Sequence, residues 1–333
     1  MTYYFFFLIF VVSILGFKLF IYIAKNKNFT DKPENISSHT TTTPTSGGLV
    51  MFLIFLPAVL YFVYFLNFNN EYLPNKLYLF FICLTAFSFF SFYDDVKNIH
   101  PIYRLIIQFF LILLSSPLFN LNEFPFENMI KLNLILYLYF YIYFLNIINF
   151  TDGTDGFLSV NSISFFIGII ILSIFENNFH FIELISFIIL PILLSFLIFN
   201  KPKAKLFMGD TGSIFLGYLI GFCSIELISN GKWYIVITLI SYTFLDCTTT
   251  LIKKSLNGYY PWARMFDYYF LKPIKQNKNN HHIVLKYNLI FNILNLIVIF
   301  FQVSYDLKYL FIISMILSIM LMYKYSQFDK IKF

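Results

Sequence analysis

Apolar residues run through this chain in long stretches separated by short polar segments. Roughly eleven of these stretches approach the length, about 20 residues, that a helix needs to cross a bilayer. They lie near residues 3–24, 47–67, 76–93, 103–119, 131–150, 157–175, 181–199, 212–229, 233–251, 287–303 and 307–323. The pattern predicts an all-α integral membrane protein with about 11 transmembrane helices, formed by residues 1–333 as a single polytopic domain. The expected cytoplasmic loops cover about 25–46, 94–102, 151–156, 200–212 and 252–286.

The composition excludes two other classes of protein. Of the 333 residues, 59% are hydrophobic and 12% charged, with 47 Phe and 25 Tyr. A soluble domain is about 25% charged, so neither a soluble enzyme nor a disordered chain fits. Cys83, Cys223 and Cys247 all lie in apolar runs and match neither a disulfide framework nor a zinc spacing.

The basic residues predict the orientation, because Lys and Arg collect in cytoplasmic loops. One set of loops carries 18 Lys and Arg residues, the opposite set carries four, and Lys18 lies inside the first stretch. The N-terminus is therefore expected outside and the C-terminus in the cytoplasm, in the cell inner (plasma) membrane. The net charge of +6 has this topological cause, so no nucleic-acid partner is expected.

Five polar clusters interrupt the apolar pattern, and all five fall on the predicted cytoplasmic side. The first runs from Asp31 to Gly48, where Gly47 and Gly48 would allow close backbone approach, although an ordinary loop explains it equally well. The second holds the adjacent Asp94 and Asp95. Two neighbouring carboxylates are tolerable beside a cation, and carboxylates with substrate phosphates are the usual ligands of Mg²⁺. A solvated helix end is the alternative.

The third and fourth clusters have the more specific patterns. Asn146, Asn149, Asp152 and Asp155 follow one another at a spacing of three, which places oxygen ligands and amides at a helix end. The fourth cluster, 203–213, contains two lysines that could attract phosphate and an aspartate that could ligate a metal. Its alternative is a basic inner loop with a helix cap. The residues concerned are Lys203, Lys205 and Asp210, with Thr211 and Ser213 expected to cap the next helix.

The fifth cluster begins at Asp246 and ends at the paired histidines of the last long loop. Its basic residues could hold phosphate oxygens or could serve only as a positive-inside anchor. They are Lys253, Lys254, Arg264, His281 and His282. Together the clusters indicate phosphoryl chemistry at the inner membrane surface, which depends on positioning and charge neutralisation. The sequence has no phosphate loop of the Gly-Lys-Ser/Thr type.

These motifs resemble those of the polyprenyl-phosphate N-acetylhexosamine-1-phosphate transferases. The resemblance extends from Asp31 to His282, and it is strongest over 146–156 and 207–213. The adjacent aspartates followed by Arg104 and Gln108 also match, as does the series Asp246, Lys253, Lys254 and Gly258.

The resemblance implies transfer of a sugar 1-phosphate from a UDP-sugar to undecaprenyl phosphate, with release of UMP and dependence on Mg²⁺ or Mn²⁺. The implied metal ligand is Asp210, and the implied catalytic residues are Asp94, Asp95, Asp152 and Asp155. The substrate-binding residues are then expected to be Asn146, Asn149, Phe207, Lys203, Lys205, Lys253, Lys254, Arg264, His281 and His282. The expected partners are a UDP-N-acetylhexosamine, undecaprenyl phosphate and the lipid bilayer, and a homodimer stays open.

The motifs also bear on which branch of the family this chain resembles, and so on which donor sugar is expected. The first loop resembles that of enzymes that initiate O-antigen or capsule synthesis, which favours a UDP-N-acetylglucosamine-type donor and a role in lipopolysaccharide biosynthesis. The alternative is the phospho-N-acetylmuramoyl-pentapeptide transferase of peptidoglycan synthesis. That branch carries three consecutive histidines where this chain has Asn280, His281 and His282. A polytopic transporter is a remote alternative, since transporters place ionisable groups near the membrane midplane.

Overall fold

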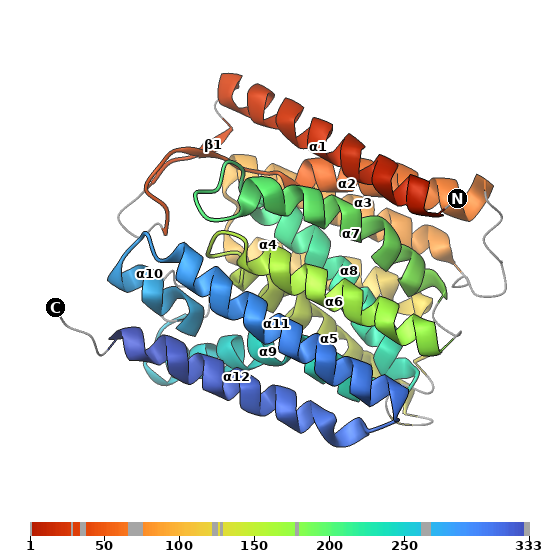
Figure 1. The fold of residues 1–333 in the computed structure, drawn as a ribbon. Helices are drawn as coiled ribbons and strands as arrows, with labels where there is room; N and C mark the ends of the chain where they lie inside the picture. The colour runs from red at the N-terminus through yellow and green to blue at the C-terminus, as the bar shows by residue number, and fades with distance from the viewer. Residues whose placement is uncertain are drawn as a thin grey trace.

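Every apolar stretch of the sequence forms a helix in the computed structural model (Figure 1). The structure describes residues 2–27, 29–33, 38–65, 76–121, 126, 129–176, 180–260 and 268–329. The long helices are α1 (Thr2–Asn26), α2 (Gly48–Leu60), α3 (Leu77–Lys97), α4 (Pro101–Ser115), α5 (Ile130–Phe150), α6 (Phe157–Phe175), α7 (His180–Asn200), α8 (Gly209–Ser229), α9 (Trp233–Leu256), α11 (His281–Ser304) and α12 (Phe311–Ser326). Ten spans among the described residues are long and apolar enough to cross a membrane. The predicted all-α polytopic class is confirmed.

The second stretch gives the shortest of these helices. α2 contains Pro57 and continues as the π-helix η1 (Tyr61–Phe65). Proline removes a backbone donor and crowds the preceding turn, which is a common reason for a local change of helix type. The described part of this helix is apolar but shorter than a full span.

Short elements fill the loops. β1 (Thr30–Asp31) and β2 (Thr43–Pro44) pair antiparallel in the first loop. The last long loop contains η4 (Tyr269–Leu271) and α10 (Lys272–Gln276), so its polar residues are partly helical rather than open loop. Short 3-10 helices also lie at Ser116–Leu118, Lys308–Leu310 and Gln327–Asp329.

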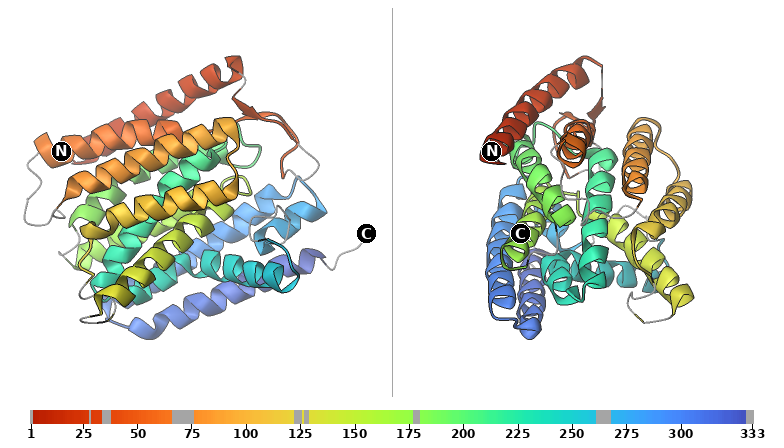
Figure 2. Two further views of the ribbon diagram at one scale, coloured as in Figure 1. Left: turned by 180° about the vertical axis from the view of Figure 1, so that it is seen from behind. Right: turned by 90° about the vertical axis from the view of Figure 1, so that its right-hand side faces the viewer.

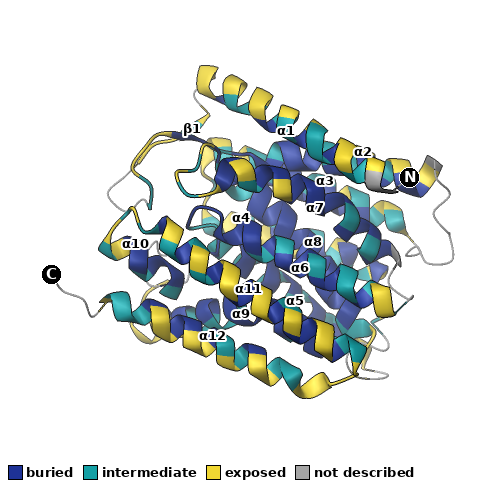
Figure 3. Cartoon of the chain, viewed as in Figure 1, coloured by how far each residue is buried: buried dark blue, intermediate teal, exposed yellow. Residues whose placement is uncertain are grey.

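α8 lies at the centre of the bundle and is buried over most of its length (Figure 3). The backbones of α2 and α8 are in direct contact where the helices cross: a Cβ atom added to Gly48 would lie 2.0 Å from the Cα of Gly212. Only glycine allows two backbones to approach this closely. α1 and α12 lie at opposite edges of the bundle in the view of Figure 1.

The polar clusters gather at one end of the bundle, where β1 and α10 also lie (Figures 1 and 2). α3, α5, α7 and α9 end there, whereas α2, α4, α6, α8 and α11 begin there. The alternation follows from antiparallel helices joined by short loops. Residues far apart in sequence are thereby brought to a single end of the bundle.

Candidate active site

Asp95, at the end of α3, caps the start of α8. Its carboxylate accepts hydrogen bonds from the amides of Asp210 (2.8 Å) and Thr211 (3.2 Å) and from the hydroxyls of Thr211 (2.6 Å) and Ser46 (2.8 Å). A carboxylate at a helix N-terminus satisfies free amides and interacts favourably with the helix dipole. The contact joins the first loop, α3 and α8.

This arrangement corrects one sequence-based expectation. Thr211 and Ser213 were expected to cap α8, but Met208 occupies the cap position and makes no side-chain cap bond. Ser213 instead donates to the side chain of Asn149 (2.8 Å) on α5. The cap comes from a distant helix, which local sequence patterns do not reveal.

Gly209 makes the contact between Asp95 and α8 sterically possible. Its φ of +73° lies in the left-handed region, and an added Cβ would lie 2.6 Å from a carboxylate oxygen of Asp95. Any other residue here would be strained and would displace the capping carboxylate.

Arg104, in the first turns of α4, lies between two aspartates from other helices. Its guanidinium is 2.7 Å from Asp94 and 2.5 Å from Asp210. Asp94 is buried and also accepts the amide of Ile99 (2.7 Å). Buried carboxylates need such partners, so Arg104 supplies the positive charge that allows Asp94 and Asp210 to lie near each other.

Asp152 has a different environment, in the turn between α5 and α6. Burial, followed in importance by the charges of Asp210, Asp95 and Asp155, raises the pKa of the Asp152 carboxyl well above its usual range. Within the described ranges its carboxylate has neither a hydrogen bond nor an ion-pair partner. An unpartnered carboxylate among like charges is a position where a cation would be strongly stabilising.

Asp155 holds the segment that follows α7. Its carboxylate accepts the amides of Lys203 (3.0 Å) and Ala204 (3.1 Å). The ring of His281 lies against the same turn: Nδ1 accepts the amide of Asp155 (3.1 Å), and Nε2 donates to the carbonyl of Ser38 (3.1 Å). His281 therefore connects the start of α11 with the first loop.

Asn200, the last residue of α7, fixes the same segment from its other side. It accepts the amide of Gly156 (3.0 Å) and donates to the carbonyl of Leu206 (3.1 Å). Asn200 is not predictable from the sequence as a site residue, since a lone Asn at the end of an apolar run carries no motif. The motif that contains Arg104 does not indicate its role either.

The remaining predicted residues of α5 and the 200–208 segment lie close to this network. Asn146 donates to Gln108 (2.8 Å) on α4. The ring of Phe207 is partly exposed and meets the ring of His39 edge-on, with centroids 5.0 Å apart. The amide of Phe207 donates to the carbonyl of Pro44 (2.8 Å), which attaches this aromatic residue to the first loop.

Four of the predicted substrate-binding residues have their side chains away from the carboxylate cluster, and a fifth lies outside the described residues. Lys253 and Lys254 lie over the rings of Tyr269 and Tyr268, at 4.7 and 4.9 Å from the ring centroids. These cation–π contacts orient the two ammonium groups toward the last loop. His282 is exposed and lies 2.9 Å from the carbonyl of Asn279, and Lys205 lines a separate cavity described below. Arg264 lies outside the described residues.

The acidic residues fit a metal that is shared with a substrate better than one held by protein alone. Over the described part of the chain, no group of three or more His, Cys, Asp or Glu residues could hold a metal ion. Mg²⁺, however, is commonly bound by one or two carboxylates together with substrate phosphates. Asp152, which has no partner among the described residues, and Asp210, whose ion pair is with Arg104, suit that arrangement.

The sequence profile of glycosyl transferase family 4 matches residues 77–228, which contain α3 to α8 and the carboxylates described above. This part of the chain is similar to the members of that family. A phospho-N-acetylmuramoyl-pentapeptide-transferase of Listeria monocytogenes is 28% identical over 268 residues, covering 74% of this chain and 80% of the relative. The enzyme of the same name from Prochlorococcus marinus is 27% identical over 300 residues, covering 80% and 81%. That from Streptococcus uberis is 28% identical over 249 residues, covering 68% and 71%.

The match to glycosyl transferase family 4 and the names of the relatives confirm the resemblance seen in the sequence. The comparisons and the apolar helices support a multi-pass membrane enzyme that transfers a sugar 1-phosphate to a polyprenyl phosphate. The names of the relatives agree with the peptidoglycan alternative rather than with the preferred O-antigen or capsule role.

Proposed function

We propose that the chain transfers phospho-N-acetylmuramoyl-pentapeptide from its UDP conjugate to undecaprenyl phosphate, releasing UMP, at the cytoplasmic face of the plasma membrane. The observation that carries the chemistry is that Arg104 pairs with both Asp94 and Asp210, while Asp152 lies close enough to Asp210 to be affected by its charge. The names of the relatives support the choice of donor.

In the proposed reaction, an oxygen of the acceptor phosphate attacks the sugar-linked phosphorus of the donor. The bond between that phosphorus and the bridging oxygen breaks, and the oxygen leaves with UMP. A phosphate monoester is largely a dianion at pH 7, so the nucleophile needs little help from a base. Positioning and charge neutralisation then account for most of the rate.

Asp152 and Asp210 are the residues proposed to hold Mg²⁺. When bound, the cation would neutralise charge on the diphosphate and on the departing UMP. Arg104 contacts Asp210 and would contribute a second positive charge at the same place. Asp95 acts through the start of α8, because all four of its hydrogen bonds orient that helix or the first loop.

Phe207 is proposed to stack on the uracil ring. Its partly exposed face and its edge contact with His39 hold an aromatic surface next to the carboxylates. Asp155 and His281 are proposed as positioning residues, since they fix the segment on which Phe207 lies.

A transfer assay with purified protein, undecaprenyl phosphate and Mg²⁺ tests the proposal. UDP-N-acetylmuramoyl-pentapeptide and a panel of UDP-N-acetylhexosamines are offered separately, and UMP release is measured. We expect UMP from the pentapeptide donor. Release from an amino-sugar donor alone would overturn the choice of branch, and no release from any donor by folded protein would overturn the activity.

One observation favours UDP-N-acetylglucosamine as a second candidate donor. Where the pentapeptide branch has three histidines, this chain has Asn280, whose side chain donates to the carbonyl of Pro273 (3.0 Å). Only His281 and His282 of that motif are present. The same donor panel separates the two candidates.

A further inference from the structure

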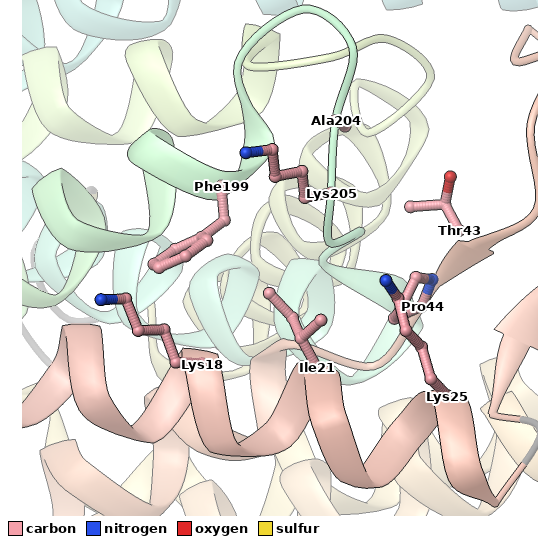
Figure 4. A pocket seen from close by; sticks show the side chains of 8 residues that line it. All are labelled: Lys18, Ile21, Lys25, Thr43, Pro44, Phe199, Ala204 and Lys205. Atoms are coloured by element: carbon pink, nitrogen blue, oxygen red, sulfur yellow. The ribbon is translucent and has the colours of Figure 1, made fainter.

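A cavity of about 400 Å³ lies beside α1, separate from the carboxylate cluster (Figure 4). α1 forms one wall, and β2 together with the segment around 199–205 forms the other. Its lining residues are Lys18, Ile21, Lys25, Thr43, Pro44, Phe199, Ala204 and Lys205. The volume is within the range of small-ligand sites, about 300–1,000 Å³.

Three lysines make this cavity strongly cationic. Lys18, Ile21 and Lys25 are spaced by three and four residues, so their side chains stand on one face of α1, as Figure 4 shows. Lys205, on the segment after α7, lines the cavity on the side opposite α1. Within the described ranges no Asp or Glu pairs with any of the three lysines. The described residues therefore supply positive charge here without an acidic counterion among them.

The position of Lys18 in the membrane indicates what kind of anion could balance these lysines. Lys18 lies eight residues before Asn26, the last residue of α1, which at 1.5 Å per residue is about 12 Å along the helix. The surrounding helix is apolar, and Leu15, Leu19 and Tyr22 are exposed at the edge of the bundle. A charged lysine inside a spanning helix destabilises the protein in the bilayer unless its ammonium group reaches the membrane interface or an anion.

The walls between the lysines are apolar. Ile21, Pro44 and Phe199 line the cavity among the charged groups. A ligand that satisfies both features is an amphipathic anion, with a phosphate for the lysines and a hydrocarbon chain for the exposed side of α1.

We propose that this cavity binds the phosphate group of an anionic membrane phospholipid, with Lys18, Lys25 and Lys205 as its cationic ligands. The bound headgroup would stabilise the segment after α7, since Asp155 accepts the amide of Ala204 and Pro44 accepts the amide of Phe207. The site is distinct from the proposed transferase site, and its test does not depend on turnover.

Native mass spectrometry of the purified full chain, titrated with phosphatidylglycerol or phosphatidylcholine, provides the test. We expect one phosphatidylglycerol to bind preferentially. Lys18→Gln and Lys25→Gln should each weaken that binding about fivefold, as expected for one lysine near an anionic lipid. Lys25→Arg should preserve it. Lys27→Gln is the matched control, because Lys27 is exposed two residues beyond Lys25 and does not line the cavity.

Three results would overturn the proposal. Equal weakening by Lys27→Gln would indicate general surface attraction instead of a site. Displacement of the lipid by inorganic phosphate at the same concentration would identify a free-anion site. Binding of undecaprenyl phosphate that depends on Lys18 and Lys25, without binding of phosphatidylglycerol, would assign the cavity to the acceptor. Size-exclusion profiles of the variants verify that each is folded.

Discussion

The guanidinium of Arg104 lies 2.5 Å from the carboxylate of Asp210, a residue 106 positions later in the chain. The pair connects the start of α4 with the start of α8. Because Asp94 shares the same guanidinium, one cation balances two acids at the centre of the proposed site.

Replacing Arg104 by Gln should lower both stability and turnover. Without the guanidinium, Asp94 and Asp210 lose their shared counter-charge, and unfolding should become easier by about 1–2 kcal/mol. Turnover should fall about 100-fold. Thermal unfolding in EDTA and the UMP-release assay measure the two effects. Lys97→Gln removes an exposed charge from the neighbouring helix end and is expected to change neither; a similar loss in that control would contradict the specific role of Arg104.

Gly209→Ala should be far more harmful than Gly231→Ala. Both glycines have φ near +74°, but an added Cβ at Gly231 meets nothing within 4 Å, whereas at Gly209 it meets the carboxylate of Asp95. The left-handed conformation alone costs roughly 1–2 kcal/mol, so any excess in Gly209→Ala reports displacement of Asp95 together with the backbone of Ser46, whose amide nitrogen would lie 2.8 Å from the added Cβ. Comparison of the two thermal midpoints and activities checks this. Equal effects would show that the contact with Asp95 is unimportant.

The stability of the protein in EDTA should fall as pH rises, through Asp152. Its pKa is raised in the folded protein, whereas an unfolded Asp has a pKa of about 3.9. Between these values the folded state binds the extra proton, so the free energy of unfolding decreases with increasing pH. Asp152→Asn should flatten this dependence. Thermal midpoints from pH 4 upward test the expectation, and an unchanged slope in the variant would refute it.

Asp210→Asn should reduce turnover about 100-fold or more while the protein remains folded. The amide of residue 210, which Asp95 accepts, is unchanged by the substitution, so the start of α8 should stay capped. Removal of one carboxylate should also increase the Mg²⁺ concentration needed for half-maximal activity. A Mg²⁺ titration of UMP release measures both quantities. Full activity at low Mg²⁺ would rule out Asp210 as a metal ligand.

Phe207→Ala should weaken nucleotide binding. Stacking on a base is worth roughly 1–3 kcal/mol, so KM for the donor should rise about fivefold or more, with a smaller change in kcat. Phe207→Tyr keeps the aromatic face and should restore most of the affinity. An unchanged donor dependence in Phe207→Ala would argue that uracil binds elsewhere.

The helices were predictable because a bilayer imposes a simple condition on sequence: about 20 apolar residues for each span. The clustering of polar residues at one end followed from the same spans and from the distribution of Lys and Arg. α11 begins at His281, several residues before the expected 287, since polar residues can continue a helix beyond the apolar core.

The contacts inside the site were not predictable in the same way. Nothing near Asp95 in the sequence indicates that it caps α8, and nothing near Lys253 indicates that it lies over Tyr269. These contacts depend on how helices pack in three dimensions. Lys205 illustrates the limit: its neighbours in sequence belong to the site, but Lys205 itself lines another cavity together with Lys18 and Lys25.

The segment between α7 and α8 is attached at several points to different parts of the chain. Asn200 holds Leu206, Asp155 holds 203–204, and the first loop holds 207–208 through the amides of Gly47 and Gly48. Its shape is therefore specified jointly by three stretches: the end of α7, which adjoins it, and two that are remote in sequence, the turn at Asp155 and the first loop. In a chimera with a related transferase, exchange of this segment alone should yield inactive protein, whereas the three stretches moved together form the smallest transplantable unit.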